Sequence, residues 1–487
     1  MRVESLEIII KTTNMTMRKF FVTLWLSLLV AGAWAGEYDK YYVELPTEVA
    51  QVTVPEIPQN VVRLTDCGGK GDGVTLNTEA FKEATKRLTA MGGGKIVVGD
   101  GVWLTGPIEL KDNIELHVER GALIYFSPDK RLYEGHTDRE QRVLPCIYAT
   151  GRKNIAITGE GIIDGNGQQW RPVKRTKMSD VEWKMYQSMG GYTTEDGKLW
   201  YPWKLKNKYP DIVEQPKQYE NLRNDLIRLF CCENILIKGV TVQNAPRFHV
   251  HPNNCRNVIV DGITVRCPWN AQNGDGIDFT DVNIGLIVNN TVDVGDDGIC
   301  MKSSVAKKEA PANGCEDIIV ENNTVYHAHG GFVLGSNTTS GIRRMVVRKN
   351  RYCSTDTGLR FKSGLGRGGK TEKIYIQDII MSDIAKEAIV FQCDYSDHDA
   401  DGTPKRSATL TEKQKKRIPE FQDIHINNVI CMGCKTGLKA KGLEGLDCVH
   451  DITIDNTTIV YRKKASEIDE KTTNIASKAR YVSVSTR

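Results

Sequence analysis

The sequence predicts an all-β protein folded as a single-domain parallel β-helix, with a short N-terminal capping helix and two long loop insertions. A short apolar β triplet recurs along the chain, its successive copies between residues 237 and 376 are 23 to 32 residues apart, and no helical pattern separates them. Repeats of this length, filled with short strands, are typical of β-solenoids. The triplets are residues 155–157, 235–237, 258–260, 286–288, 318–320, 345–347, 374–376, 424–426 and 452–454.

Residues 1–35 are predicted to be a signal peptide. Residues 17–19 form a short basic region, residues 20–31 an apolar run, and Ala33 and Ala35 fit a small-residue cleavage site. Residues 1–16 are interpreted as an upstream extension. The apolar run is short for a membrane span. We therefore expect residues 36–487 to be exported to the periplasm or the extracellular space, without membrane insertion and as a monomer.

Charge and cysteine content exclude several classes of function. The chain has 65 basic and 61 acidic residues, a formal net charge of +4, which gives no support for nucleic-acid binding. Its 13 cysteines are irregularly spaced, and Cys431 and Cys434 form a lone C-x-x-C without a second pair, which disfavours zinc. We expect mostly buried thiols with one or two disulfides, and no cofactor or metal.

A helix is predicted over residues 78–89, capped by Asn77 and ended by the glycines at 92–94. Phe81, Ala84 and Leu88 lie on one face of it. A single amphipathic helix before a long β region suits a cap over the exposed end of a solenoid.

Two long gaps in the repeat predict insertions at about residues 168–224 and 396–420. The first contains Trp170, Trp183, Trp200 and Trp203, which either form a sugar-facing wall or pack the loop together. The second contains an Asp-x-Asp-x-Asp-Gly run from Asp397 through Asp401 that resembles the start of a calcium loop, although position twelve is not Glu. A plain solvated loop is the alternative there.

Three carboxylates gather at turn-like Asp-Gly positions: Asp275, Asp296 and Asp297. Asp275 and Asp297 are 22 residues apart, about one coil, so their turns should lie one above the other at a strand spacing of ~4.8 Å. Clustered acids on a rigid scaffold are what glycoside hydrolysis requires. His329 aligns beside Asp296 and is expected to orient a carboxylate.

The strands that follow these turns predict a basic strip beside the acids. Because side chains alternate across a strand, one set should point inward. The inward residues are Ile277, Ile299, Phe332, Leu359 and Leu438, and then Phe279, Met301, Leu334, Phe361 and Ala440. The outward face then collects Lys302, Arg360 and Lys362, with Lys439 and Lys441 as candidates farther along. Such a strip suits an anionic substrate; an ordinary solvated face is the alternative.

Two histidines, His249 and His251, alternate on one side of the segment before the first acid. They are expected to line the upstream end of the groove, His251 as a substrate-binding residue, or to hydrogen-bond within a turn.

Four short motifs occur in order along these strands: Asn273-Gly-Asp275, Gly295-Asp-Asp297, Ala328-His-Gly330 and Arg360-Phe-Lys362. Their order and spacing resemble the N-T-D, D-D, G-H-G and R-I-K motifs of the polygalacturonase family, glycoside hydrolase family 28. The resemblance covers residues 62–461. Gly274, Ala328 and Phe361 depart from it without removing a reacting group, although Gly274 is expected to loosen the turn that holds Asp275.

The resemblance implies an inverting hydrolase on a right-handed parallel β-helix, with carboxyl groups ~6.5–9.5 Å apart. It implies that Asp296 is the general acid, that Asp275 and Asp297 activate water, and that His329 supports the acid. It further implies that Arg360 and Lys362 hold a galacturonate carboxylate and Asn273 a sugar hydroxyl.

The substrate expected from the resemblance is pectin, cut by exo-action on homogalacturonan. A rhamnogalacturonan-directed hydrolase of the same family is the alternative. A calcium-dependent pectate lyase and a non-catalytic β-helical adhesin or carbohydrate-binding protein are more distant ones.

Overall fold

The computed structural model describes residues 36–134, 143–202, 223–305, 314–395 and 412–484. The chain divides into two compact units, residues 1–45 and 46–487. The described part of the first contains one short 3-10 helix, η1 (Asp39–Tyr42). The predicted signal peptide, Trp203 and the Asp397–Asp401 run lie outside the described residues.

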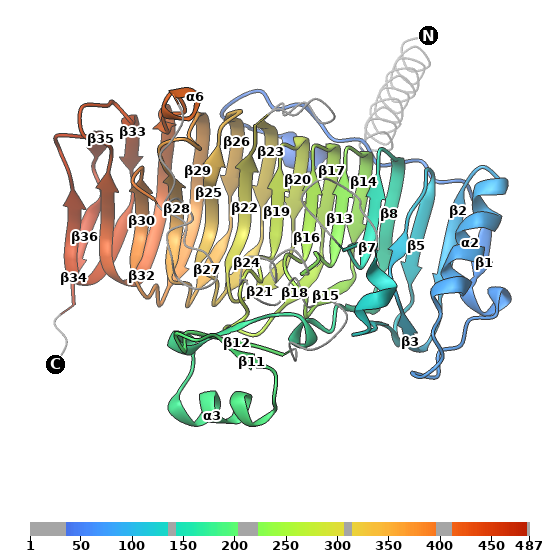
Figure 1. Ribbon diagram of the computed structural model, residues 1–487. Helices are drawn as coiled ribbons and strands as arrows, with labels where there is room; N and C mark the ends of the chain where they lie inside the picture. Colours follow the sequence, from blue (N-terminus) through green and yellow to red (C-terminus); the bar gives the residue numbers. More distant parts are fainter. Residues whose placement is uncertain (1–35, 135–142, 203–222, 306–313, 396–411, 485–487) are drawn as a thin grey trace, which may run out of the picture. The chain divides into compact units, whose positions relative to one another are not determined.

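The second unit is the predicted right-handed parallel β-helix (Figure 1), which confirms the fold class. Three stacks of parallel strands run along it, each strand pairing with its equivalent in the next coil. The first stack consists of β4 (Ile108–Glu109), β7 (Ile147–Thr150), β13 (Ile227–Phe230), β16 (Val250–Asn253), β19 (Ile277–Thr280), β22 (Asp297–Ser303), β25 (Gly330–Thr338), β28 (Thr357–Ser363), β30 (Glu387–Gln392) and the end of β32 (Ile424–Lys441).

The second stack consists of β1 (Val61–Arg63), β2 (Gly94–Val98), β5 (Ile114–Val118), β8 (Lys153–Gly159), β14 (Glu233–Lys238), β17 (Arg256–Asp261), β20 (Asn283–Val288), β23 (Cys315–Glu321), β26 (Ile342–Arg348), β29 (Lys370–Ser382), β31 (Glu420–Phe421), β33 (Val449–Asp455) and β35 (Thr473–Ser477). The third stack consists of β3 (Gly101–Thr105), β6 (Ala122–Phe126), β9 (Ile162–Asp164), β15 (Thr241–Gln243), β18 (Thr264–Arg266), β21 (Thr291–Asp293), β24 (Thr324–Tyr326), β27 (Arg351–Cys353), β34 (Thr458–Ile468) and β36 (Arg480–Ser483). The long strands β29 and β32 contribute to more than one stack.

The predicted inward ladder is confirmed, with one coil that the sequence alignment missed. Ile277 pairs with Ile299, and the ladder continues through Phe332 and Leu359, all buried. The next partner is Ile389 of β30, and only then Leu438. The alignment relied on a leading glycine, and β30 has Ala388 at that position, so Lys439 and Lys441 lie one coil farther from Arg360 than predicted.

A buried asparagine ladder joins successive coils where the second stack turns into the third. The backbone N–H of Asn290 donates to Oδ1 of Asn323 at 3.0 Å, and the N–H of Asn323 donates to Oδ1 of Asn350 at 2.9 Å. Each side chain therefore satisfies a backbone group that the turn leaves unpaired in the neighbouring coil. All three residues are buried.

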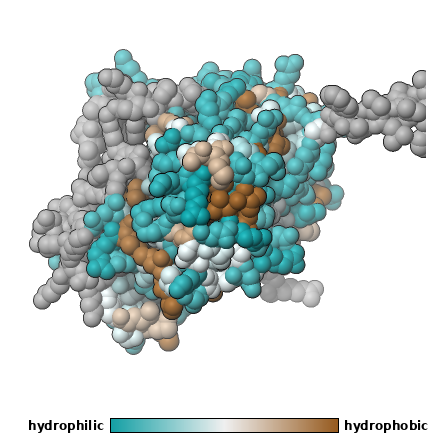
Figure 2. Space-filling view, turned by 90° about the vertical axis from the view of Figure 1, so that its right-hand side faces the viewer, coloured by the Kyte–Doolittle hydropathy of each residue, from teal (hydrophilic) through white to brown (hydrophobic). Residues whose placement is uncertain are grey.

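The capping helix is confirmed as α2 (Thr78–Ala90), with Phe81, Ala84 and Leu88 buried against the first coil. The preceding 3-10 helix is η2 (Leu64–Cys67). Asn77 does not cap α2 as predicted, because its side chain bonds to the loop at Lys70 instead. The surface at this end is mostly hydrophilic with scattered apolar patches (Figure 2), as expected where a helix covers the apolar interior.

The first insertion is not only a loop. Its described part contains η4 (Gly167–Gln169), η5 (Arg175–Lys177), α3 (Asp180–Ser188) and a small antiparallel sheet of β10 (Val173–Lys174), β11 (Tyr192–Thr193) and β12 (Leu199–Tyr201). Trp170, Trp183 and Trp200 are buried, the last two against Val173. The sugar-facing wall is therefore wrong for these three rings: Trp183 and Trp200 pack the insertion together, and Trp170 packs into the core of the β-helix.

The remaining helices are short. They are η3 (Lys130–Tyr133) and, in the second insertion, α6 (Glu412–Lys415). Within the described ranges, no helix has the length and apolarity needed to cross a membrane. All thirteen cysteines are free, ten of them buried, so the one or two disulfides expected from the sequence are not formed.

Replacing the central member of the asparagine ladder should destabilise the β-helix. Asn323→Ala leaves the buried backbone N–H of Asn290 without its acceptor and removes the donor to the carbonyl of Ile287, and we expect a loss of about 2–3 kcal/mol in the free energy of unfolding. Urea denaturation followed by circular dichroism measures it. Thr291→Ala, at an exposed position next to the ladder, is the control and should change stability by less than about 0.5 kcal/mol. Equal effects of the two substitutions would contradict this role of the ladder.

Candidate active site

The acids lie on successive loops that lead from the third stack into the first. Asp275 precedes β19, Asp296 and Asp297 stand at the start of β22, and His329 precedes β25. The backbone N–H of Gly276 donates to the carbonyl of Asp297 at 2.9 Å, and that of His329 donates to the carbonyl of Asp296 at 2.8 Å. The coil register thus brings these residues together as the spacing predicted.

Asp296 forms a pair with His329. Nδ1 of His329 lies 3.0 Å from Oδ1 of Asp296, and the backbone N–H of Asn273 donates to its Oδ2 at 3.2 Å. Burial by itself would raise the pKa of Asp296, but the charge and hydrogen bond of His329 outweigh it and hold the pKa well below its usual range. Asp296 is also the most exposed of the three acids, with 16% of its side chain accessible.

Asp297 is held by the two cations of the R-F-K motif. Nζ of Lys362 donates to Oδ2 of Asp297 at 2.6 Å, and Nη1 of Arg360 lies 3.4 Å from Oδ1. Burial opposes ionisation, but Lys362 and then Arg360 lower the pKa of Asp297. Tyr395 lies beside both cations, its ring centre 5.2 Å from the Lys362 ammonium. The sequence analysis did not single out Tyr395.

Asp275 differs from the other two acids. Burial raises its pKa well above the usual range, and the charges of Asp278, Asp296 and Asp297 add to this, while Lys302 only partly offsets it. Its Oδ1 is buried without a hydrogen-bond partner among the described residues, and its Oδ2 lies 3.1 Å from the Lys302 ammonium. Of the three acids, Asp275 is therefore the one that retains a proton most strongly.

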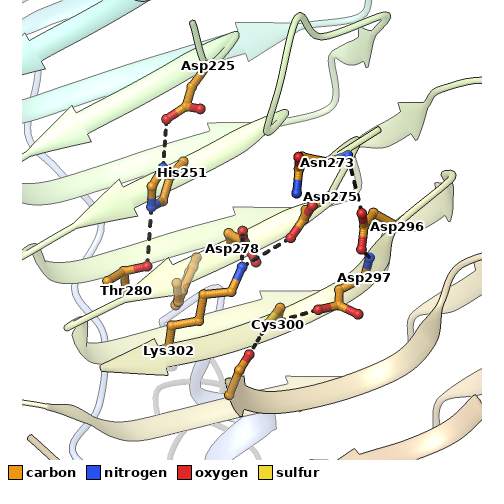
Figure 3. A network of polar contacts seen from close by, with 12 residues as sticks. Asp225, His251, Asn273, Asp275, Asp278, Thr280, Asp296, Asp297, Cys300 and Lys302 are labelled. Carbon is orange, nitrogen blue, oxygen red and sulfur yellow. Dashed lines mark hydrogen bonds and ion pairs between the residues drawn. The ribbon is translucent and has the colours of Figure 1, made fainter. Parts of the chain in front are cut away.

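Lys302 is occupied by two carboxylates. Its ammonium lies 2.6 Å from Oδ2 of the buried Asp278 as well as 3.1 Å from Asp275 (Figure 3). The predicted contact of Lys302 with substrate remains untested, and its geometry favours holding Asp275 in place. Side-chain alternation along the strands did not reveal this pairing of Lys302 with Asp278.

His251 is buried one coil before Asp278. Its Nδ1 lies 2.7 Å from Oδ2 of Asp225 and its Nε2 3.2 Å from the Thr280 hydroxyl (Figure 3). Burial lowers the pKa of His251, although Asp225 acts in the opposite direction. Both ring nitrogens already contact protein groups, so His251 supports the upstream end of the site. Its predicted substrate contact is likewise untested.

Asn273 is positioned by a residue that the sequence analysis missed. Nη2 of Arg223 donates to Oδ1 of Asn273 at 2.8 Å, and Nη1 donates to the carbonyl of Gln272 at 2.7 Å. The turn is tight, because a β carbon on Gly274 would lie 2.9 Å from that of Ala271. A larger residue at position 274 would require Ala271 to shift, and the expectation that Gly274 loosens the turn stays a prediction.

The first insertion reaches the acid cluster. Nζ of Lys177 donates to the carbonyl of Gly295 at 3.0 Å, directly before Asp296. Burial lowers the pKa of Lys177, and the charge of Asp296 partly offsets this. Only the tertiary structure shows that a lysine of the insertion lies beside the acids.

A metal ion could find ligands at this cluster. Ligand atoms of Asp296, Asp297 and His329 lie within 4.8 Å of one another. Two cations, Arg360 and Lys362, already neutralise Asp297 there, which disfavours a further positive charge.

Comparisons with known proteins agree with the motifs. The family model described as glycosyl hydrolases family 28 matches residues 189–480. An exo-poly-α-D-galacturonosidase of Dickeya chrysanthemi is 30% identical over 394 residues, which cover 77% of this chain and 63% of that relative. This chain thus spans less than two thirds of that relative's length. A probable polygalacturonase of Vitis vinifera is 26% identical over 428 residues, covering 85% of this chain and 77% of the relative.

Solved structures show the same fold. A hyperthermoactive exopolygalacturonase from Thermotoga maritima superposes with a TM-score of 0.67 at 28% identity, covering 88% of this chain and 94% of the other. A family 28 exopolygalacturonase of Yersinia enterocolitica gives a TM-score of 0.60 at 22% identity, covering 87% and 78%.

Removing the charge of Asp275 or of Asp296 should affect stability with opposite signs. Asp275 has a raised pKa in the folded protein, so above about pH 4 folding takes up a proton and stability falls as the pH rises, by at most about 1.4 kcal/mol per unit. Asp275→Asn removes this loss, and its melting temperature should rise relative to the native protein between pH 4 and pH 7.

Asp296 has a lowered pKa, so its ionised form contributes stability above the unfolded pKa of about 3.8, and this contribution is lost as the pH falls. Asp296→Asn should therefore melt below the native protein at pH 7, with the gap closing under acid conditions. Thermal denaturation at a series of pH values measures both variants. The same trend in the two variants would contradict the assigned proton positions.

Proposed function

The chain belongs to the glycosyl hydrolases family 28, and from this premise we propose that it is an inverting hydrolase of α-linked galacturonic acid bonds in pectin, acting from a chain end. This proposal rests on one observation. The coil register brings Asp275, Asp296 and Asp297 together on adjacent coils, with Arg360 and Lys362 beside them. Paired carboxyls supply an acid and a base, and the two cations suit a sugar carboxylate.

Asp296 acts as the general acid and protonates the leaving oxygen. It is the most accessible of the three carboxyls, so a sugar can reach it directly. In the free protein its pKa is low, but a bound substrate covers it and removes water, which raises the pKa of a carboxyl. His329, at 3.0 Å, supplies or accepts a proton at its Oδ1.

Asp275 and Asp297 activate the attacking water from the opposite face of the sugar. Asp297 is ionised beside Lys362 and can accept a proton. Asp275 begins protonated in the free protein, so substrate binding must transfer its proton toward Asp296 before it can act as a base. Three interacting carboxyls that share protons titrate together, which permits such a shift.

The substrate is held on both sides of these acids. Arg360 and Lys362 bind the carboxylate of one galacturonate, in competition with Asp297. Asn273 keeps its amide oxygen on Arg223, and its amide nitrogen, unpaired among the described residues, is directed to a sugar hydroxyl. Exo-action is supported by the insertion that reaches Gly295 through Lys177, and by the names of the relatives from Dickeya and Thermotoga.

Product analysis on polygalacturonate tests this function. We expect a single short product from the earliest time point, because exo-action starts at a chain end. The product should carry no ultraviolet-absorbing unsaturated end, and a chelator should not affect its formation. Thin-layer chromatography over time measures this. An early ladder of oligomers would mean endo-action, whereas chelator-sensitive unsaturated products would replace the hydrolase by a lyase.

A matched pair of substitutions is the control for the mechanism. Asp296→Asn should lower kcat by about 10²- to 10⁴-fold, the usual contribution of a general acid. Asp293→Asn alters the same coil, where Asp293 forms a similar but half-exposed pair with His327 at 2.9 Å, and should leave kcat within about twofold. Equal losses in the two variants would contradict the role of Asp296.

We also propose export and a monomeric state. The basic residues at 17–19, the apolar run at 20–31 and the cleavage site at Ala35 support export. The exported protein should begin at Gly36 and elute at the size of one chain, which N-terminal sequencing and size-exclusion chromatography with light scattering measure. An uncleaved N-terminus or a dimer would refute the corresponding part.

A further inference from the structure

A second group of charges lies one coil upstream of the acids. Asp225 is buried between Arg228, whose Nη1 lies 3.0 Å from its Oδ2, and His251 at 2.7 Å. Arg247 adds a further positive charge that acts on Asp225. None of these residues belongs to the four motifs, and none of them takes part in the proposed mechanism.

Arg247 differs from Arg228, Arg360 and Lys362 because it forms no ion pair with a carboxylate in the part of the chain that the structure describes. Its guanidinium lies over the Phe248 ring at 4.6 Å, and its Nε forms no hydrogen bond in the described part of the chain. It is half-buried, and so remains accessible to a ligand. A partly desolvated guanidinium with free donors is suited to bidentate binding of a carboxylate.

Phe248 connects Arg247 to the reacting acids. The Lys302 ammonium, which holds Asp275, lies 4.6 Å from the centre of the same ring. Phe248 stands two residues before Val250, just as Asp275 stands two residues before its partner Ile277. Phe248 is therefore about one strand spacing, ~4.8 Å, before Asp275 along the first stack, and Arg247 is its neighbour in the chain.

When the charged side chains of the groove are summed, one net positive charge remains upstream of Asp296 and one remains downstream of it. Downstream, Arg360 and Lys362 share the single carboxylate of Asp297. Upstream, the single carboxylate of Asp225 pairs with Arg228, and Arg247 acts on it without an ion pair among the described residues. Burial lowers the pKa of His251, which disfavours a further positive charge there. Between them, Lys302 and Asp278 cancel.

We propose that Arg247 binds the carboxylate of the galacturonate on the upstream side of the cleavage point, so that an unesterified galacturonate is required on both sides of the cleaved bond. β16 and β28 are four coil steps apart, on the order of 20 Å, which is long enough for at least two sugars. This inference rests on the proposed hydrolase function and specifies its substrate as homogalacturonan.

A neutral sugar upstream would leave Arg247 partly buried without its partner. A site that is built to pair a charged group discriminates against an analogue that lacks it. A bond with rhamnose at that position, as in rhamnogalacturonan, should therefore be cleaved poorly, as should a bond beside a methyl-esterified galacturonate.

Steady-state kinetics on polygalacturonate, in wild type and three variants, tests this role. Arg247→Gln should lower kcat/KM by about tenfold to a hundredfold, mainly through KM, since one charge-assisted contact is lost. Arg247→Lys should recover part of the loss. Arg256→Gln, at an exposed position of β17 in the same coil, should stay within about twofold of wild type.

The salt dependence separates binding from structural damage. The loss in Arg247→Gln should be greatest at low ionic strength and shrink toward 1 M salt, because screening weakens the contact in the wild type. A loss that is equal at all salt concentrations, or no loss at all, would overturn the inference while leaving the hydrolase function intact. So would a wild type that cleaves rhamnogalacturonan oligomers in preference to polygalacturonate. A wild type without products on either substrate would instead refute the proposed function.

Discussion

Three carboxylates cannot be buried side by side as anions unless positive charges share their space, and this constraint shapes the site. Asp297 is ionised because Lys362 and Arg360 contact it, Asp296 because His329 does, and Asp275 is left as the carboxyl with the raised pKa. Charges of equal sign at such separations push their pKa values apart. The same arrangement that makes burial tolerable thus gives the three carboxyls different pKa values in the free protein.

The β-helix supplies the rigidity that this balance needs. Asp275 precedes β19, Asp297 and Lys302 lie in β22, and Arg360 and Lys362 lie in β28, so parallel pairing between these strands fixes the relative heights of acids and cations. A shift by one residue would move Lys362 from the groove into the interior, where Phe361 packs, so the buried ladder specifies the register. The asparagine ladder around Asn323 secures the same register where the second stack turns into the third.

The first insertion shows how a long excursion can serve the site without contacting it through its aromatic rings. Its buried tryptophans Trp183 and Trp200 pack into one hydrophobic cluster within the insertion, whereas Lys177 contacts the loop of Asp296. Upstream, Phe248 lies between two cations, Arg247 and Lys302, and of these only Lys302 forms ion pairs with carboxylates of the described ranges. Substrate recognition on that side therefore depends on a residue outside the recurring motifs.

The sequence by itself determined the solenoid, the capping helix and the gathering of Asp275, Asp296, Asp297 and His329, because side-chain alternation and a period of one coil are local properties. It missed the β30 coil, whose alanine interrupts the glycine pattern, and it misjudged the insertion's tryptophans, whose burial depends on how that segment folds back. Only the tertiary structure decided which cation meets which carboxylate. In the sequence, the three outward-facing cations at 302, 360 and 362 cannot be told apart by the carboxylate that each contacts. Their partners depend on distances between coils, and those distances set the pKa values in the site.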